Sequence, residues 1–89
     1  MAYPRFKTGE ELITAFNDIA DKHKALGSTL EDLTDNELYV FIAGKTLDFG
    51  RSLAASLENA ALHLVTSEKR AWIVKSLSTR YNDLLGFNG

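Results

Sequence analysis

Residues 33–65 read LTDNELYVFIAGKTLDFGRSLAASLENAALHLV, and this stretch decides the fold. It opens with the spacing of a helix-capping box, in which the side chains of Thr34 and Glu37 accept each other's backbone N–H groups. Leu33 and Leu38 have the spacing of a hydrophobic staple around the same turn, so a helix is predicted to follow. Because apolar side chains occupy most of its circumference, this helix is expected to be buried on two sides. From Leu38 onward the stretch carries charge only at Lys45, Asp48, Arg51 and Glu58.

The length of this helical pattern conflicts with the size of the chain. A continuous helix over 35–65 would be about 46 Å long at roughly 1.5 Å per residue. A compact domain of 89 residues has a radius of gyration near 12 Å and a diameter of about 31 Å. We therefore predict a break between Gly44 and Gly50, since glycine disfavours a helix interior by about 1 kcal/mol. The alternative is one long kinked helix that projects and is covered by a second chain.

The region before this stretch is predicted to form a helix over 9–26. Thr8 and Glu11 have the spacing of another capping box, and Gly27 supplies the left-handed residue that commonly ends a helix. Between them, apolar residues recur at intervals of three and four, which is the period of one helix face.

The last helix is predicted to begin after Thr66 or Ser67 and to end at Gly86, with Phe87 folding back onto it. The sequence therefore predicts one all-α domain over residues 1–89, in which residues 1–7 form an extended arm. Its four expected helices cover residues 9–26, 35–49, 50–65 and 67–85, and the alternative joins the middle two into one kinked helix.

Composition points to a soluble globular protein. Hydrophobic residues make up 45% of the chain and charged residues 25%, and there is no cysteine to form a disulfide. The segment Met1–Lys7 lacks the apolar core of a signal peptide, and no stretch has the roughly 18 apolar residues of a membrane span. We expect a cytoplasmic protein that does not enter a membrane. A chain this short also has a thin core, so burial against a partner would add stability.

Charge is distributed unevenly along the chain. Residues 1–58 carry ten acidic and six basic side chains, whereas residues 59–89 carry two acidic and four basic ones. Opposite ends of opposite sign favour self-association or the steering of a partner. The basic side chains of the last helix (Lys69, Arg70, Lys75 and Arg80) are scattered around its exposed arc, and the isoelectric point is near 5.6. Both facts argue against direct nucleic-acid binding, which remains an alternative for helix 67–85.

No recognisable catalytic or metal-binding pattern is present. Gly44-Lys45-Thr46 matches the end of a phosphate-binding loop, but Tyr39 stands where that motif needs its first glycine. The two histidines, His23 and His63, have no second imidazole or carboxylate at the spacing of a metal face. The sequence therefore predicts a protein that is not an enzyme and holds no metal or cofactor.

Two segments resemble the Hha/YmoA family of small helical partners of nucleoid proteins. Leu33 to Leu38, continuing through Val40 and Phe41, is similar to the start of that family's central helix. Ala71-Trp72-Ile73-Val74-Lys75 is similar to its closing tryptophan segment. The family's central Asp-His-Arg stretch aligns with 48–51 only through an insertion. The resemblance implies a small helical protein that binds a larger protein partner.

We therefore expect a small non-enzymatic protein–protein interaction or regulatory module, self-associating as a homodimer or docking on a larger protein. An accessory or structural component of a phage or mobile-element assembly is the alternative of a different class. We expect the apolar helix over residues 35–65 to form the seam, that is, the surface in contact with the partner, together with the start of the last helix. The candidate partner-binding residues are Phe41, Ile42, Phe49, Leu53, Lys69, Arg70 and Trp72.

Overall fold

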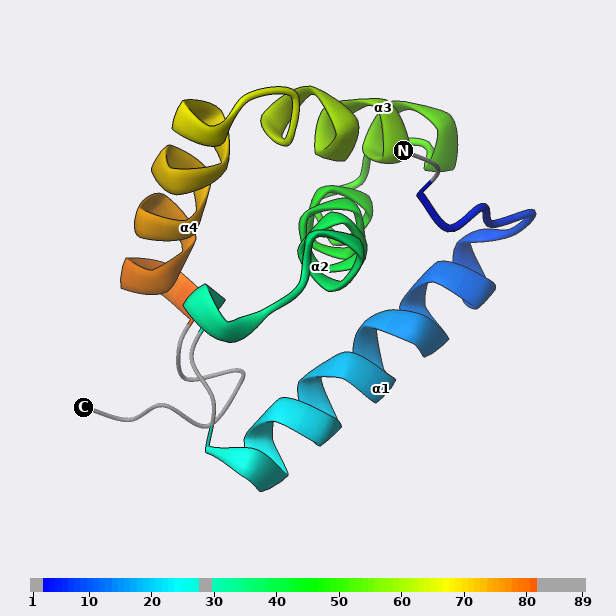
Figure 1. Ribbon diagram of the computed structural model, residues 1–89. Helices are drawn as coiled ribbons and strands as arrows, with labels where there is room; N and C mark the ends of the chain where they lie inside the picture. Colours follow the sequence, from blue (N-terminus) through cyan, green and yellow to red (C-terminus); the bar gives the residue numbers. More distant parts are fainter. Residues whose placement is uncertain (1–2, 28–29, 82–89) are drawn as a thin grey trace.

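The computed structural model describes residues 3–27 and 30–81, and within them it is all-helical, as predicted. Figure 1 shows α2 in the middle of the molecule, with the other helices arranged around it. In chain order the elements are α1 (Gly9–Leu26), a 3-10 turn η1 (Leu30–Asp32), α2 (Asp35–Asp48), α3 (Leu53–His63) and α4 (Ser67–Tyr81). The predicted ending of the last helix at Gly86 and the contact of Phe87 lie outside the described residues.

The ends of α1 match the sequence prediction. The side chain of Thr8 accepts the backbone N–H of Glu11 at 3.2 Å, which satisfies one of the free donors of the first turn. Gly27 follows the helix with φ 67°, and its N–H bonds the carbonyls of His23 and Lys24. This left-handed conformation suits glycine, which has no Cβ to clash with the backbone.

Helices α1 and α2 run antiparallel and make close contact along their length. A Cβ at Gly9 would lie 3.2 Å from the side chain of Leu47, so the start of α1 meets the end of α2. At the other end, His23 of α1 contacts Glu37 in the first turn of α2. Halfway along, the helices approach so closely that a Cβ at Gly44 would lie 2.6 Å from the ring of Phe16.

The predicted break of the middle stretch is confirmed, and it lies at Gly50. Helix α2 ends at Asp48, and Gly50 adopts φ 98°, a conformation that side chains disfavour. Ser52 then caps α3 by accepting the N–H of Ala55 at 3.1 Å. The other candidate hinge, Gly44, lies inside α2, and the helix continues through it. The ring of Phe16 occupies the space that a side chain at this position would need, which accounts for the glycine. The turn lets α3 fold back on α2, and the radius of gyration is 12.1 Å.

Helix α2 is the centre of the core. Seven consecutive residues, from Leu38 to Gly44, are buried, so side chains on every side of the helix are covered. The covering side chains come from the rest of the chain, namely Leu12, Leu30, Leu33, Ala60, Ile73 and Val74. This corrects the sequence-based expectation that α2 needs a partner to hide its apolar surface. Helices α1 and α3 pack directly against α2, and side chains of η1 and α4, among them Leu30, Ile73 and Val74, complete its cover.

Side-chain hydrogen bonds join α3 to α2 and cap the start of α4. Asn59 of α3 donates to the hydroxyl of Thr46, which in turn donates to the carbonyl of Ile42, at 3.0 Å and 2.8 Å. Thr66 caps α4 by accepting the N–H of Lys69 at 3.1 Å, as one of the two predicted starts required. No described helix has the length and apolar character to cross a membrane.

Candidate protein-docking surface

The seven candidate residues do not form one surface. Phe41 and Ile42, expected on a partner seam, are 0% and 3% exposed and belong to the core around α2. That expectation is corrected, because side chains enclosed by their own chain cannot meet a partner while the protein is folded. Phe41 stacks on Phe16 of α1, with the ring centroids 5.1 Å apart. The two residues therefore stabilise the fold.

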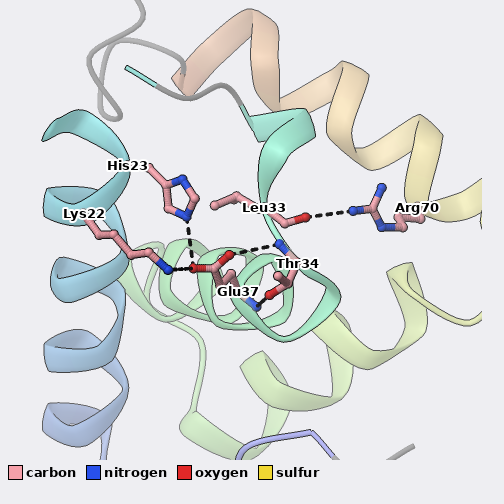
Figure 2. A network of polar contacts seen from close by, with 6 residues as sticks. All are labelled: Lys22, His23, Leu33, Thr34, Glu37 and Arg70. Atoms are coloured by element: carbon pink, nitrogen blue, oxygen red, sulfur yellow. Dashed lines mark hydrogen bonds and ion pairs between the residues drawn. The ribbon is translucent and has the colours of Figure 1, made fainter. Parts of the chain in front are cut away.

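Arg70 is committed to an internal contact. Its Nε donates to the carboxylate of Asp35 at 2.6 Å, and one terminal nitrogen donates to the carbonyl of Leu33 at 2.9 Å. Figure 2 shows the side chain reaching from α4 toward the segment just before α2. The guanidinium thus ties α4 to the start of α2, and an opposite charge already compensates its own.

A second polar network joins α1 to the start of α2, centred on Glu37. One carboxylate oxygen accepts the backbone N–H of Thr34 at 3.0 Å, and the other accepts Lys22 at 3.2 Å. That second oxygen also lies 3.0 Å from Nε2 of His23, whose side chain is buried. Figure 2 shows Lys22 and His23 converging on Glu37 from one helix, with Thr34 on the other side.

This network holds Glu37 in its charged form. Burial raises the pKa of the carboxyl, but the hydrogen bonds from Thr34, His23 and Lys22 outweigh it and lower the pKa from 4.5 to about 2. Both oxygens face protein donors, so the network connects helices and does not present a free base. Nδ1 of His23 is buried and has no hydrogen-bond partner within residues 3–27 and 30–81. The described residues contain no group of three His, Cys, Asp or Glu side chains suited to a metal ion.

Phe49 and Leu53 lie at the turn between α2 and α3. Phe49 is 71% exposed and borders an open groove of about 610 Å³, together with Thr46, Arg51, Ala55 and Asn59. Leu53 is half-buried and packs against the core. This turn is separated from the C-terminal end of α3 by ten residues of helix, or about 15 Å.

The remaining two candidates, Lys69 and Trp72, meet at the opposite end of α3. Trp72 is 59% exposed, and its ring stacks on that of His63 with the centroids 5.7 Å apart. Lys69 and Lys75, three residues before and after Trp72, are exposed and share its side of α4. Val65, in the connection between α3 and α4, is 66% exposed. We call His63, Val65, Lys69, Trp72 and Lys75 the corner surface.

Burial lowers the pKa of His63 from its ordinary value of 6.5, and the positive charge of Lys69 lowers it further. Both effects favour the neutral imidazole, which brings no further charge to a half-buried position beside the indole. The stack restricts the orientations open to the Trp72 ring and leaves much of that ring exposed to solvent.

Of the five residues of the corner surface, the sequence-based candidates include Lys69 and Trp72 but not His63, Val65 or Lys75. Nine residues and a helix break separate His63 from Trp72, and no local spacing rule connects residues on two different helices. The only available signal was that an apolar segment, Leu62 to Val65, runs directly into a predicted helix start.

No known protein family matches this sequence, and neither the curated proteins nor the solved structures include one with significant similarity to it. The resemblance to the Hha/YmoA family therefore rests on its two short segments alone.

Proposed function

We propose that this protein is a small non-enzymatic interaction module that docks on another protein through the corner surface. The observation that carries the proposal is Trp72, a large aromatic side chain that is 59% exposed and held in place by His63. Tryptophan is strongly enriched among the residues that dominate binding energy in protein interfaces. Because the stack already restricts the indole, less conformational entropy is lost when a partner covers it.

The surroundings of Trp72 have the composition of an interface. Val65 adds apolar area beside the connection of the two helices, and Lys69 and Lys75 supply a polar rim. Isolated exposed apolar residues are ordinary on protein surfaces, but an ordered aromatic stack flanked by charges favours recognition.

A protein partner is favoured over nucleic acid. Aromatic and basic side chains together also suit single-stranded nucleic acid, whose bases stack on exposed rings. However, Arg70 is paired with Asp35, and the whole chain carries a net charge of −2. The charge available to neutralise phosphates is therefore small.

The test places a photoreactive amino acid at Val65, which leaves Trp72 in place, and identifies the macromolecule that becomes cross-linked in cells of the native host. The same amino acid at Leu26, which is 67% exposed at the end of α1, serves as the control position. We expect a protein that is cross-linked from position 65 and not from position 26.

The identified protein is then purified and its affinity measured for two variants. Trp72→Ala is expected to weaken binding at least about 10-fold, whereas Phe49→Ala, which removes another exposed aromatic ring, changes it less than about 2-fold. The proposal is wrong if Trp72→Ala binds like the unmodified protein, if Phe49→Ala causes the larger loss, or if the cross-linked molecule is a nucleic acid.

A further inference from the structure

A second surface is complementary to the corner surface. An open groove of about 470 Å³ lies between the N-terminal arm and the first three turns of α1. Phe6 and Ala15 give it an apolar lining, and both side chains pack partly into the core. The volume falls within the range of about 300–1,000 Å³ typical of small-molecule sites, and an indole ring is smaller than most such ligands.

The rim of this groove is acidic. Glu10, Glu11 and Asp18 border it, and Arg5 is the one cation on the rim. Asp21 extends the same exposed side of α1 by one turn. These four carboxylates form no ion pair with any described cation, so their charge is available to a partner. A cation-flanked aromatic ring is complementary to a groove that offers the apolar side chains of Phe6 and Ala15 within an acidic rim.

The corner surface presents such a ring. Trp72 lies between Lys69 and Lys75, and Glu68 is the one carboxylate of α4. Figure 1 shows α1 and α4 on opposite flanks of α2. The groove is lined by residues 5–18, whereas Trp72 stacks on His63 at the connection of α3 and α4, so the two surfaces belong to different parts of the chain and a contact between them joins two molecules.

We propose that the partner of the corner surface is a second copy of this chain, which receives Trp72 in the groove at the start of its α1. This inference rests on the proposed function, because it uses the same docking surface. The two contacting surfaces differ, so the association is head-to-tail and leaves one free groove and one free Trp72 at the ends of every assembly. Such a contact builds chains that grow with concentration.

The contact is small and partly electrostatic, which determines how it is measured. One ring in one groove buries less than the roughly 800 Å² per partner of a standard stable interface, so we expect dissociation constants on the order of 0.1 mM. Raising the salt concentration from about 50 to 500 mM is expected to weaken association about 10-fold, because surface charges become screened.

The experiment mixes two variants that each lack one half of the contact. Trp72→Ala removes the ring and keeps the groove, whereas Glu11→Lys with Asp18→Lys reverses two charges on the rim and keeps the ring. Each variant alone is expected to stay monomeric by sedimentation equilibrium at about 1 mM. The mixture is expected to form 1:1 dimers and nothing larger, because neither product has a second complementary pair. The unmodified protein exceeds the dimer mass at the same concentration.

A spectroscopic readout checks which contact forms. The chain has one tryptophan, so in the mixture only the charge-reversed variant contributes tryptophan emission. Since that variant lacks a working groove, its emission shifts to shorter wavelength only if the Trp72→Ala variant covers its ring. A third variant, Glu11→Gln with Asp18→Asn, preserves side-chain size and is expected to weaken self-association about 5-fold without affecting helical circular dichroism.

Three results would overturn the inference: an unmodified protein that stays monomeric at about 1 mM, a Trp72→Ala variant that still self-associates, or a mixture that yields no dimer. The outcome is separable from the proposed function. If self-association is absent while Trp72→Ala still loses about 10-fold affinity for the cross-linked protein, the inference is wrong and the docking surface stands. If Trp72→Ala alters neither measurement, both are wrong.

Discussion

Helices α2 and α3 look alike in sequence and differ in the structure. Both are rich in apolar residues, and α3 is the more apolar of the two. Yet Leu38 to Gly44 of α2 are buried without interruption, whereas Ser56 and Ala60 are the buried residues of α3. Position in the fold accounts for the difference, because α2 lies between α1 and α3 with side chains of η1 and α4 closing the core, whereas α3 covers α2 on one side. Apolar content therefore does not reveal which helix keeps a surface for a partner.

The sharpest test of this contrast compares one side chain from each helix. Phe41→Ala in α2 removes a ring that is 0% exposed and is expected to lower the free energy of unfolding by about 3–5 kcal/mol. Leu62→Ala in α3 truncates a side chain that is 53% exposed and is expected to cost less than about 1 kcal/mol. Urea unfolding followed by circular dichroism measures both, and similar losses would show that α3 is covered more than its exposure indicates.

A second test concerns the polar contact that positions the start of α2. The pKa of Glu37 is lowered to about 2, so its ionised form stabilises the fold fully above about pH 4.5 and loses that contribution as the pH falls toward 2. Glu37→Gln is expected to lower the free energy of unfolding by about 2–3 kcal/mol at pH 7.

The difference between Glu37→Gln and the unmodified protein is expected to shrink on acidification between pH 4.5 and 2, because protonation neutralises the glutamate. Denaturant unfolding at pH 7, 4 and 2.5 provides the measurement. A difference that is constant with pH would mean that the carboxylate charge contributes nothing, whatever its hydrogen bonds do.

A smaller effect is expected where α1 crosses α2. Gly44→Ala places a methyl group against the ring of Phe16, a contact that can be relieved only by shifting the ring or the helices. The overlap is expected to outweigh the gain of about 1 kcal/mol in helix propensity, for a net loss of about 1 kcal/mol. Combining Gly44→Ala with Phe16→Ala removes the two nearest ring carbons and leaves Cβ of residue 16 at 3.1 Å from the methyl group, so the added cost of Gly44→Ala should shrink in that background.

The smallest effect is expected at the corner surface, where the readout is optical. Because burial and Lys69 lower the pKa of His63, protonation should quench the neighbouring Trp72 with a midpoint below pH 6.5. Lys69→Met is expected to move that midpoint upward by removing a repulsive charge. His63→Gln should abolish the quenching step without changing the free energy of unfolding by more than about 1 kcal/mol. A step that persists in His63→Gln would assign the quenching to another group.

Much of the fold was predictable because its signals are local. The cap at Thr8, the capping box of Thr34 with Glu37, and the turn at Gly50 each act within a few residues of the chain. The break in the stretch 35–65 was also predicted correctly, since a helix longer than the diameter of the domain has to break or project. Gly44 was a misleading signal: the same residue type that ends helices also permits close contact between them, and only the position of Phe16 distinguishes the two roles.

The candidate docking surface was predictable only in part. Trp72 and Lys69 are sequence-based candidates that the structure places at the surface of α4, whereas the neighbouring Ile73 and Val74 are buried. Phe41 and Ile42 were misplaced because their sequence pattern is the same whether a partner or the chain itself covers them. The stack of Trp72 on His63 gave no signal at all, since it joins two helices.

The sequence by itself determined both ends of α1, the start of α2 and the break before Gly50, because capping, backbone strain at glycine and helical periodicity are short-range effects. It also determined that one central stretch had to be buried, since a charge-poor helix is unstable in water. Only the tertiary structure decided which helices cover α2 and that Trp72 and His63 meet at the surface. Those outcomes depend on how distant helices pack, and that packing is set by the sum of many weak contacts across the whole chain.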